Sequence, residues 1–291
     1  MAYVNSIART SGAFFTCSFA FLILEQKYLC STDGGLAYES CSVESICEAR
    51  QQDPSSTTGT LLYKVDESYE YFMRNWYTEM DLMCVAEAKV GMMYTWYFIG
   101  TMVGGVLAAF PDRIGRKKSV MLGLILSTIC QTVMLFVPDM IVRSICFFFM
   151  GFSNLKISQS YVWLSETVPM DRRAGAITII GIADAITGLV AGMYYIFISR
   201  DWFPLYMFVT GLSYLAILMA FLMPESPRWL LVSGRGAEGV KAINFIAWLN
   251  RSEVRIPEQT IFQETVDAGV AAVIHLQQGD TRSKSHDNMA V

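Results

Sequence analysis

Long apolar stretches separated by short charged links are the main pattern of this chain. A run of about 20 apolar residues is long enough to cross a bilayer as a helix. Runs of this kind, separated by links or turns, cover residues 90–110, 119–137, 140–164, 174–198 and 203–223. A shorter apolar run, residues 11–24, precedes them. The pattern therefore predicts a membrane protein with six transmembrane helices.

The first apolar run allows two interpretations. Its length also suits the apolar core of a signal peptide, with Arg9 as the charged flank. The following residues, Glu25-Gln26-Lys27-Tyr28, offer no small-residue cleavage site. We therefore favour a first transmembrane helix within residues 1–24, shortened at its start by truncation, and keep the signal peptide as the alternative.

The basic link Pro111–Lys118 orients the predicted helices. It joins two apolar runs through eight residues, of which four are Arg or Lys. Short links rich in Lys and Arg lie on the cytoplasmic side of a membrane. Residues 90–223 then hold helices two to six, and both chain ends are cytoplasmic, with the plasma membrane as the expected location. In the tail, 224–291, periodicity predicts amphipathic helices over 237–250 and 259–276, followed by a disordered end.

Residues 25–89 form a polar, acidic loop on the opposite, extracellular side. The loop holds Cys30, Cys41, Cys47 and Cys84. Four cysteines in a loop that faces an oxidising compartment predict two disulfides, and three pairings are possible. Free thiols are the alternative. A zinc site is disfavoured because the loop has no histidine and the cysteine spacings are irregular.

Composition narrows the class of protein further. The chain is 53% hydrophobic and 16% charged, against about 25% charged residues in soluble domains. It has no basic patch interleaved with aromatic residues, so we expect no nucleic-acid partner. The two histidines, His275 and His286, lie in the tail. We therefore expect no catalytic residue, no metal and no cofactor, and a non-enzymatic protein.

Polar side chains within the predicted spans are the candidate functional residues. Lys156 and Asp184 each lie about 15 Å, at 1.5 Å per residue, from the charged end of their helix, near the bilayer midplane. Asn154 and Gln159 lie close to Lys156 in the sequence. A charge at this depth is costly, so partners are expected. We hypothesise that Lys156 and Asp184 face one interior cavity as an ion pair; the alternative is a pair that only fixes helix packing.

Three segments resemble the major facilitator superfamily. Residues 111–117, Pro-Asp-Arg-Ile-Gly-Arg-Lys, resemble the Asp-Arg-x-Gly-Arg-Arg/Lys loop between its helices two and three, although Ala108 stands where the family usually has glycine. Arg143 followed by Gly151 resembles its fourth-helix motif. Residues 224–230, Pro-Glu-Ser-Pro-Arg-Trp-Leu, are similar to the signature after helix six in organic cation and organic anion transporters.

The resemblance implies an all-α membrane fold, in which six transmembrane helices form one half of a major-facilitator-type bundle with a cytoplasmic helical tail. It implies transport of small organic ions by alternating access. It also implies a charge network that closes the cytoplasmic gate. By position, this gate network comprises Asp112, Arg113, Gly115, Arg116, Lys117, Glu166, Arg172, Arg173, Glu225 and Arg228.

The superfamily has twelve helices in two halves, with the substrate between them. The sequence supplies one half, so we expect either a truncated product, which we favour, or a chain that pairs with another half. Such a half is expected to be inactive alone. Its expected partners are the lipid bilayer, a small organic ion, and a second transporter half or full-length relative. The alternatives are a non-transporting membrane protein that associates with full-length transporters and a receptor that binds ligands through the cysteine loop.

Overall fold

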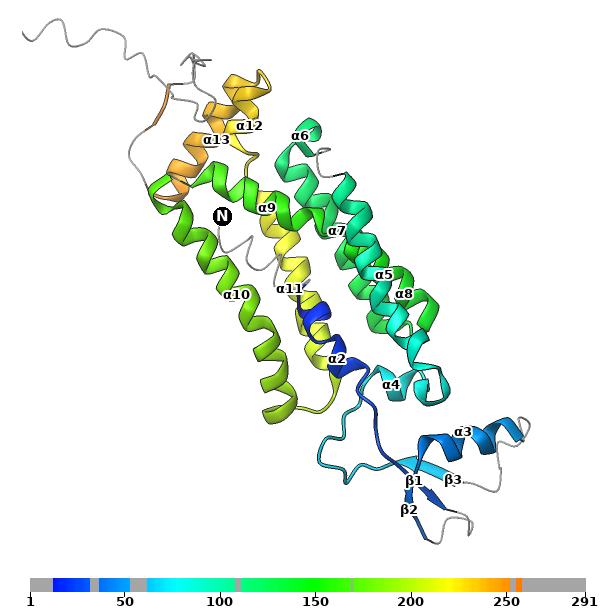
Figure 1. Ribbon diagram of the computed structural model, residues 1–291. Coiled ribbons are helices and arrows are strands. Elements are labelled where there is room, and N and C mark those ends of the chain that lie inside the picture. Colours follow the sequence, from blue (N-terminus) through cyan, green and yellow to red (C-terminus); the bar gives the residue numbers. More distant parts are fainter. Residues whose placement is uncertain are drawn as a thin grey trace, which may run out of the picture. The chain divides into compact units, whose positions relative to one another are not determined.

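The computed structural model describes residues 13–31, 37–52, 62–107, 111–168, 170–251 and 255–257. The chain divides into two compact units, Met1–Met223 and Pro224–Val291, and each is described by itself. Long helices dominate the first unit, and a small sheet follows its first helical segment (Figure 1). We call the end of the helices that carries residues 25–89 the loop end, and the end that carries residues 111–118 the basic end.

Four helical stretches of the described residues are long and apolar enough to cross a membrane. They are α7 (Arg116–Phe136), α8 and α9 together (Met140–Thr167), most of α10 (Met170–Phe197), and α11 (Trp202–Leu222). They match the last four predicted runs. The helix α5 (Glu87–Val106) has 20 residues, a length that spans a membrane, but is not one of these four stretches.

The first predicted helix is described only in part. Residues 13–22 are helical except for a turn at Ser18, and α2 covers Phe19–Leu22. The Ser18 hydroxyl donates a hydrogen bond to the carbonyl of Phe14, one turn earlier. A serine that bonds back to the preceding turn competes with the helix backbone, which explains the interruption.

The fourth predicted helix is broken near its middle. Its first part, α8 (Met140–Phe152), ends at Ser153, and α9 (Leu155–Thr167) begins after Asn154. The backbone N–H of Asn154 donates to the carbonyl of Gly151 at 3.0 Å, and that of Lys156 donates to the carbonyl of Ser153 at 3.0 Å. These bonds span three residues instead of four, so the chain tightens and turns here. The predicted fourth span, 140–164, lies within the helical stretch Met140–Thr167, and sequence analysis did not predict the break inside it.

Glycines allow α5 and α8 to touch through their backbones. A methyl group on Gly100 would lie 2.0 Å from the carbonyl oxygen of Phe148, and one on Gly151 would lie 1.9 Å from that of Tyr97. No other residue type fits at such a distance. Small residues at this spacing are typical of closely packed transmembrane helices. The helices α5 and α8 are therefore closely packed at these two glycines.

The cysteine loop contains a small antiparallel sheet that sequence analysis did not predict. Strand β1 (Tyr28–Ser31) lies between β2 (Glu39–Cys41) and β3 (Leu62–Val65). A helix, α3 (Val43–Gln52), follows β2. Cysteines pair as Cys30–Cys41, within the sheet, and Cys47–Cys84, which ties α3 to the 3-10 helix Leu82–Cys84. One of the three possible pairings is thus selected.

The second unit contains two short helices in its described part. The helix α12 (Pro227–Val232) starts at Ser226, whose hydroxyl accepts a hydrogen bond from the backbone N–H of Trp229 at 3.2 Å. Gly234 has φ 78°, in the left-handed region that favours glycine, and ends this helix. The helix α13 (Gly236–Leu249) overlaps the first predicted tail helix. The second, over 259–276, and the predicted disordered end, 277–291, lie outside the described residues.

Candidate functional site

Lys156 is a buried cation in the first turn of α9, directly after the helix break. Only 4% of its surface is exposed. Its ammonium donates hydrogen bonds to the hydroxyl of Ser127 on α7 and to the hydroxyl of Ser153, the latter at 3.5 Å. Gly123 provides the space, since a methyl group there would lie 2.7 Å from the Cβ of Lys156. Small and hydroxyl-bearing residues on α7 and at the break thus enclose this charge.

The hypothesised ion pair between Lys156 and Asp184 is not formed in this structure. The partners of the Lys156 ammonium are hydroxyl groups, whereas Asp184 lies half-buried on α10. The break at Ser153 and Asn154 explains the difference, because it directs Lys156 toward α7. Equal depth along two neighbouring helices did not therefore bring the two charges together.

The other two polar residues near the midplane lie in different surroundings. Asn154 donates from its side-chain amide to the hydroxyls of Tyr97, at 2.8 Å, and Thr101, at 3.1 Å, both on α5. Gln159 is buried, and within the described part of the chain its side-chain oxygen accepts no hydrogen bond. A buried polar atom without a partner is costly. Such an atom is a candidate to accept a hydrogen bond from a ligand, or from another part of the protein in a second conformation.

The basic end brings together some of the predicted gate residues. The Nε of Arg116, at the start of α7, lies 3.7 Å from a carboxylate oxygen of Glu166 near the end of α9, and both side chains are largely buried. Lys117 donates to the carbonyl of Phe221 on α11 at 2.8 Å. Gly115, with φ 107°, makes the turn into α7 in a conformation that favours glycine. The basic link therefore contacts two other transmembrane helices.

The remaining predicted gate residues lie on the short helix α6 (Pro111–Ile114), on α10 and in the second unit. The helix α6 carries Arg113, which is exposed. The side chain of Asp112 lies outside the described part. Arg172 is exposed and Arg173 is half-buried, both near the start of α10. Glu225 and Arg228 belong to the second unit.

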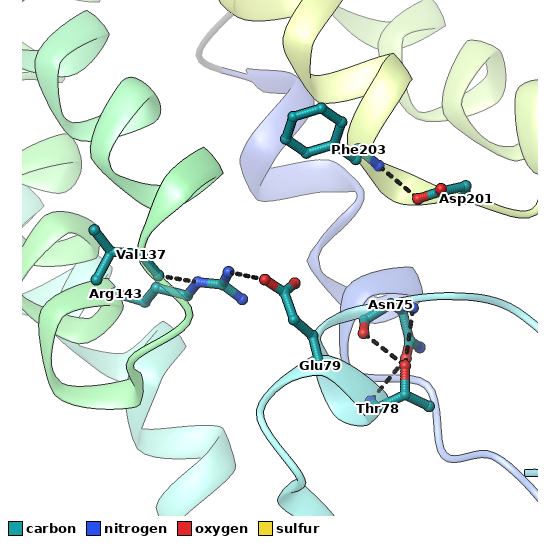
Figure 2. A network of polar contacts seen from close by, with 7 residues as sticks. All are labelled: Asn75, Thr78, Glu79, Val137, Arg143, Asp201 and Phe203. Carbon is teal, nitrogen blue, oxygen red and sulfur yellow. Dashed lines mark hydrogen bonds and ion pairs between the residues drawn. The ribbon is translucent and has the colours of Figure 1, made fainter.

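A second buried cation lies at the loop end. Arg143, in the first turns of α8, has no exposed surface. Its guanidinium forms an ion pair with Glu79 at 3.0 Å, and its Nε donates to the carbonyl of Val137 at 3.0 Å (Figure 2). The guanidinium carbon lies 4.2 Å from the ring centroid of Trp76 and 5.5 Å from that of Trp202. One carboxylate, one carbonyl and two indole rings thus surround the charge.

The short segment that carries Glu79 is itself anchored to several helices. The side-chain amide of Asn75 donates to the carbonyls of Phe21, at 3.0 Å, and Leu24, at 2.8 Å, where the first helix ends. The backbone N–H of Arg74 donates to the carbonyl of Arg200, in the turn before α11, at 2.9 Å. We call Asn75, Trp76, Glu79, Arg143 and Trp202 the loop-end joint. It connects the cysteine loop to the first helix, α8 and α11.

Sequence reasoning found Arg143 only through a family resemblance and missed its partners. Glu79 lies in an acidic loop among other carboxylates, and neither Trp76 nor Trp202 is marked by a periodic pattern. A usable signal was present, however. An arginine within the first turn of a predicted span requires a counter-ion, and acidic residues that precede another span on the same side of the membrane, here 90–110, are candidates.

The helices and buried cations define the class of protein, a multi-pass membrane protein built from an all-α bundle. A family model described as Major Facilitator Superfamily matches residues 66–263. The chain therefore belongs to the major facilitator superfamily, and the resemblance noted in the sequence is confirmed.

The similar proteins of known name are organic-solute transporters. The human "Steroid transmembrane transporter SLC22A24" is 28% identical over 198 residues, 67% of this chain and 35% of the relative. Mouse "Organic anion transporter 3" is 31% identical over 176 residues, 60% and 32% of the two chains. Caenorhabditis elegans "Organic cation transporter 1" is 30% identical over 188 residues, 62% and 31%. The chain spans about a third of the length of these relatives.

Solved structures with a similar fold come from the same superfamily. The proton:xylose symporter XylE matches with a TM-score of 0.52 and 15% identity, over 84% of this chain and 49% of that one. A partially occluded inward-open form of the Escherichia coli protein matches with a TM-score of 0.51 and 14% identity, over 84% and 55%. The expected class of fold, a half-bundle of major-facilitator type, is confirmed.

Proposed function

We propose that this chain forms the amino-terminal half of a transporter that moves small organic ions by alternating access. Named relatives transport steroids, organic anions or organic cations, which supports this class of substrate. The chain holds one set of helices, and the proposed substrate site lies between two such sets. We expect the half to be inactive alone. We place it in the plasma membrane with both ends in the cytoplasm, because the basic end carries the excess of Arg and Lys.

The observation that carries the proposed transport path is the environment of Lys156. Among the described residues, the hydrogen-bond partners of this buried ammonium, which lies beside a helix break, are hydroxyl groups. A cation without a counter-ion inside a membrane helix is costly and points to function. Lys156, Asp184, Asn154 and Gln159 are proposed to line the path of the substrate or of a coupled proton.

The basic end is the proposed cytoplasmic gate. The ion pair of Arg116 and Glu166 supports this assignment, as does the hydrogen bond from Lys117 to α11. Pairs of this kind form in one conformation and separate in the other, so they bias the equilibrium between two states. Asp112, Arg172 and the second-unit residues Glu225 and Arg228 are proposed to complete the gate in the closed state.

Replacing Lys156 with Met tests the transport path. Uptake of labelled organic anions and cations is measured in cells that express the chain alone or with the carboxyl-terminal half of a similar transporter. Lys156→Met is expected to lower the restored uptake by about tenfold or more, the equivalent of one lost charge-assisted hydrogen bond. Thermal stability is expected to be retained or raised, because a buried charge is removed.

The matched control is Lys241→Met, which removes the same charge from an exposed position on α13 and should leave uptake unchanged. Equal uptake by Lys156→Met and the unchanged chain would assign Lys156 to packing. Absence of uptake in both arms of the unchanged chain would contradict the proposal that the chain is half of a transporter.

A second candidate function is a non-transporting protein that associates with a full-length relative. The observation in its favour is the exposure of α10. Of its most apolar 18-residue stretch, 17% is buried, whereas 39–50% of the corresponding stretch is buried in the other three spans. Isoleucine, leucine and valine side chains are exposed along its length, among them Ile182 and Leu189. This surface can take a second half or a full-length relative as well as lipid.

Cysteine crosslinking tests whether the exposed face of α10 is covered by lipid or by another protein. We expect Leu189→Cys, 67% exposed, to crosslink with a co-expressed relative or second half. Leu218→Cys on α11, 58% exposed, is the matched position and should stay uncrosslinked. Crosslinking without any gain in uptake favours the association role over transport, whereas no crosslink at Leu189 leaves lipid as the cover of α10.

A further inference from the structure

A hollow of about 530 Å³ lies along α5 and α8 toward the loop end. The two helices touch through Gly100 and Gly151 deeper in the bundle, where no side chain separates the backbones. Nearer the loop end, larger side chains line a groove between them. The lining includes Lys89, Met92 and Trp96 from α5, with Ile141, Ile145 and Phe148 from α8.

The groove is apolar along its length and cationic at one end. Met92, Trp96, Ile141 and Ile145 are all exposed in the first unit. Lys89 lies in the first turn of α5 and is exposed, and among the described residues its ammonium has no ion pair or hydrogen bond. Trp96 follows seven residues later, about 10 Å further along the helix axis. The groove therefore combines a surface cation with an apolar wall that extends into one leaflet.

We propose that this groove binds a membrane phospholipid, with its phosphate at Lys89 and one acyl chain along Trp96 and Ile145. Charge complementarity selects this occupant. Lysine side chains near a membrane surface attract anionic headgroup oxygens, and a neutral sterol supplies no such charge. A second copy of the chain offers exposed carboxylates at the same end, Glu87 and Asp139, and is therefore the alternative occupant that the experiment must separate from a lipid. The inference depends on the chain spanning a membrane and is independent of its transport activity.

Photolabelling of the full chain in phosphatidylcholine nanodiscs tests this site. The probe is a phosphatidylcholine with a diazirine in one acyl chain, and crosslinked residues are mapped by mass spectrometry. Labelling is expected to concentrate on 89–96 and 141–148. Lys89→Gln should lower it by about fivefold, the equivalent of one net hydrogen bond to the phosphate, whereas Lys89→Arg should retain it.

A groove-filling variant gives a second, independent readout. Ser144 also lines the hollow, so Ser144→Trp should abolish labelling there. Leu218→Trp on α11, 58% exposed and outside the groove, is the matched control and should change nothing. Lys89→Gln keeps the proposal testable if Ser144→Trp fails to fold, because Lys89 is exposed.

Three results would overturn the proposal. Labelling spread evenly over the exposed positions of α5, α8, α10 and α11 would indicate ordinary lipid contact without a site. Displacement of the probe by cholesterol at equal concentration would assign the groove to a sterol. Spontaneous dimers crosslinked through Ile145→Cys, with no lipid label in the groove, would assign it to a second copy of the chain.

Discussion

Replacing Glu79 with Leu is expected to destabilise the protein by about 3 kcal/mol, because it leaves a buried charge without its counter-ion. The charge is Arg143, which has no exposed surface and pairs with Glu79 at 3.0 Å. The remaining contacts of Arg143, with the two indole rings and the carbonyl of Val137, stabilise a cation but do not neutralise it. The loss is measured by unfolding in mixed detergent micelles, followed by tryptophan fluorescence.

The control for Glu79 is another carboxylate of the same loop. Glu67 lies 4.0 Å from Arg74, and their side chains are 72% and 69% exposed. Exposed pairs contribute about 0–1 kcal/mol, so Glu67→Leu should have little effect. The double variant Glu79→Leu/Arg143→Met removes both charges and should recover much of the lost stability. A similar loss from Glu79→Leu and Glu67→Leu would show that the loop-end joint does not stabilise the fold.

The contacts of the loop-end joint also predict which segments lose stability when Glu79 is replaced. Trp76 and Trp202 pack around Arg143, with ring centroids 5.7 Å apart, and the bonds of Asn75 reach the end of the first helix. Loss of the Glu79 pair should therefore loosen the attachment of the cysteine loop to the helices. In hydrogen exchange, residues 73–79 are expected to lose protection before α7 does.

Gly151→Ala is expected to destabilise the bundle by about 3 kcal/mol, at the upper end of the usual cost of overpacking. The added methyl group would lie 1.9 Å from the carbonyl oxygen of Tyr97 and 3.0 Å from the backbone nitrogen of Thr101. These are backbone atoms, so no side-chain rotation relieves the clash and α5 must move away from α8. The same unfolding assay in mixed micelles measures the loss.

Gly105 provides the matched control on α5. A methyl group there meets no atom within 4 Å, and alanine favours a helix over glycine by up to about 1 kcal/mol. Gly105→Ala should therefore leave stability unchanged or raise it. If Gly151→Ala proved equally harmless, the close approach of α5 and α8 would be disproved. The helix contact beside which the proposed lipid groove lies would then be disproved as well.

The sequence predicted the spans well because hydropathy is a local property. Runs such as 119–137 and 203–223 are continuous in the chain, and burial of their backbone in lipid requires a helix. The break between α8 and α9 was not predicted, since Ser153 and Asn154 tolerate either a helix or a turn. The sheet was missed for a related reason: β1, β2 and β3 are short strands, and their pairing depends on distant segments and on disulfides.

For the candidate sites too, the sequence determined which residues are unusual, and the tertiary structure determined their contacts. The sequence by itself determined that Lys156 and Arg143 are cations within apolar helices, that the basic link lies at one end of the helices, and that four cysteines share one polar loop. Only the tertiary structure decided their partners: hydroxyls for Lys156, Glu79 for Arg143, and Cys84 for Cys47. The cost of a buried charge follows from residue type and depth, but its partner is supplied by helix breaks, glycine contacts and loop anchors. These bring together residues that are far apart in the chain.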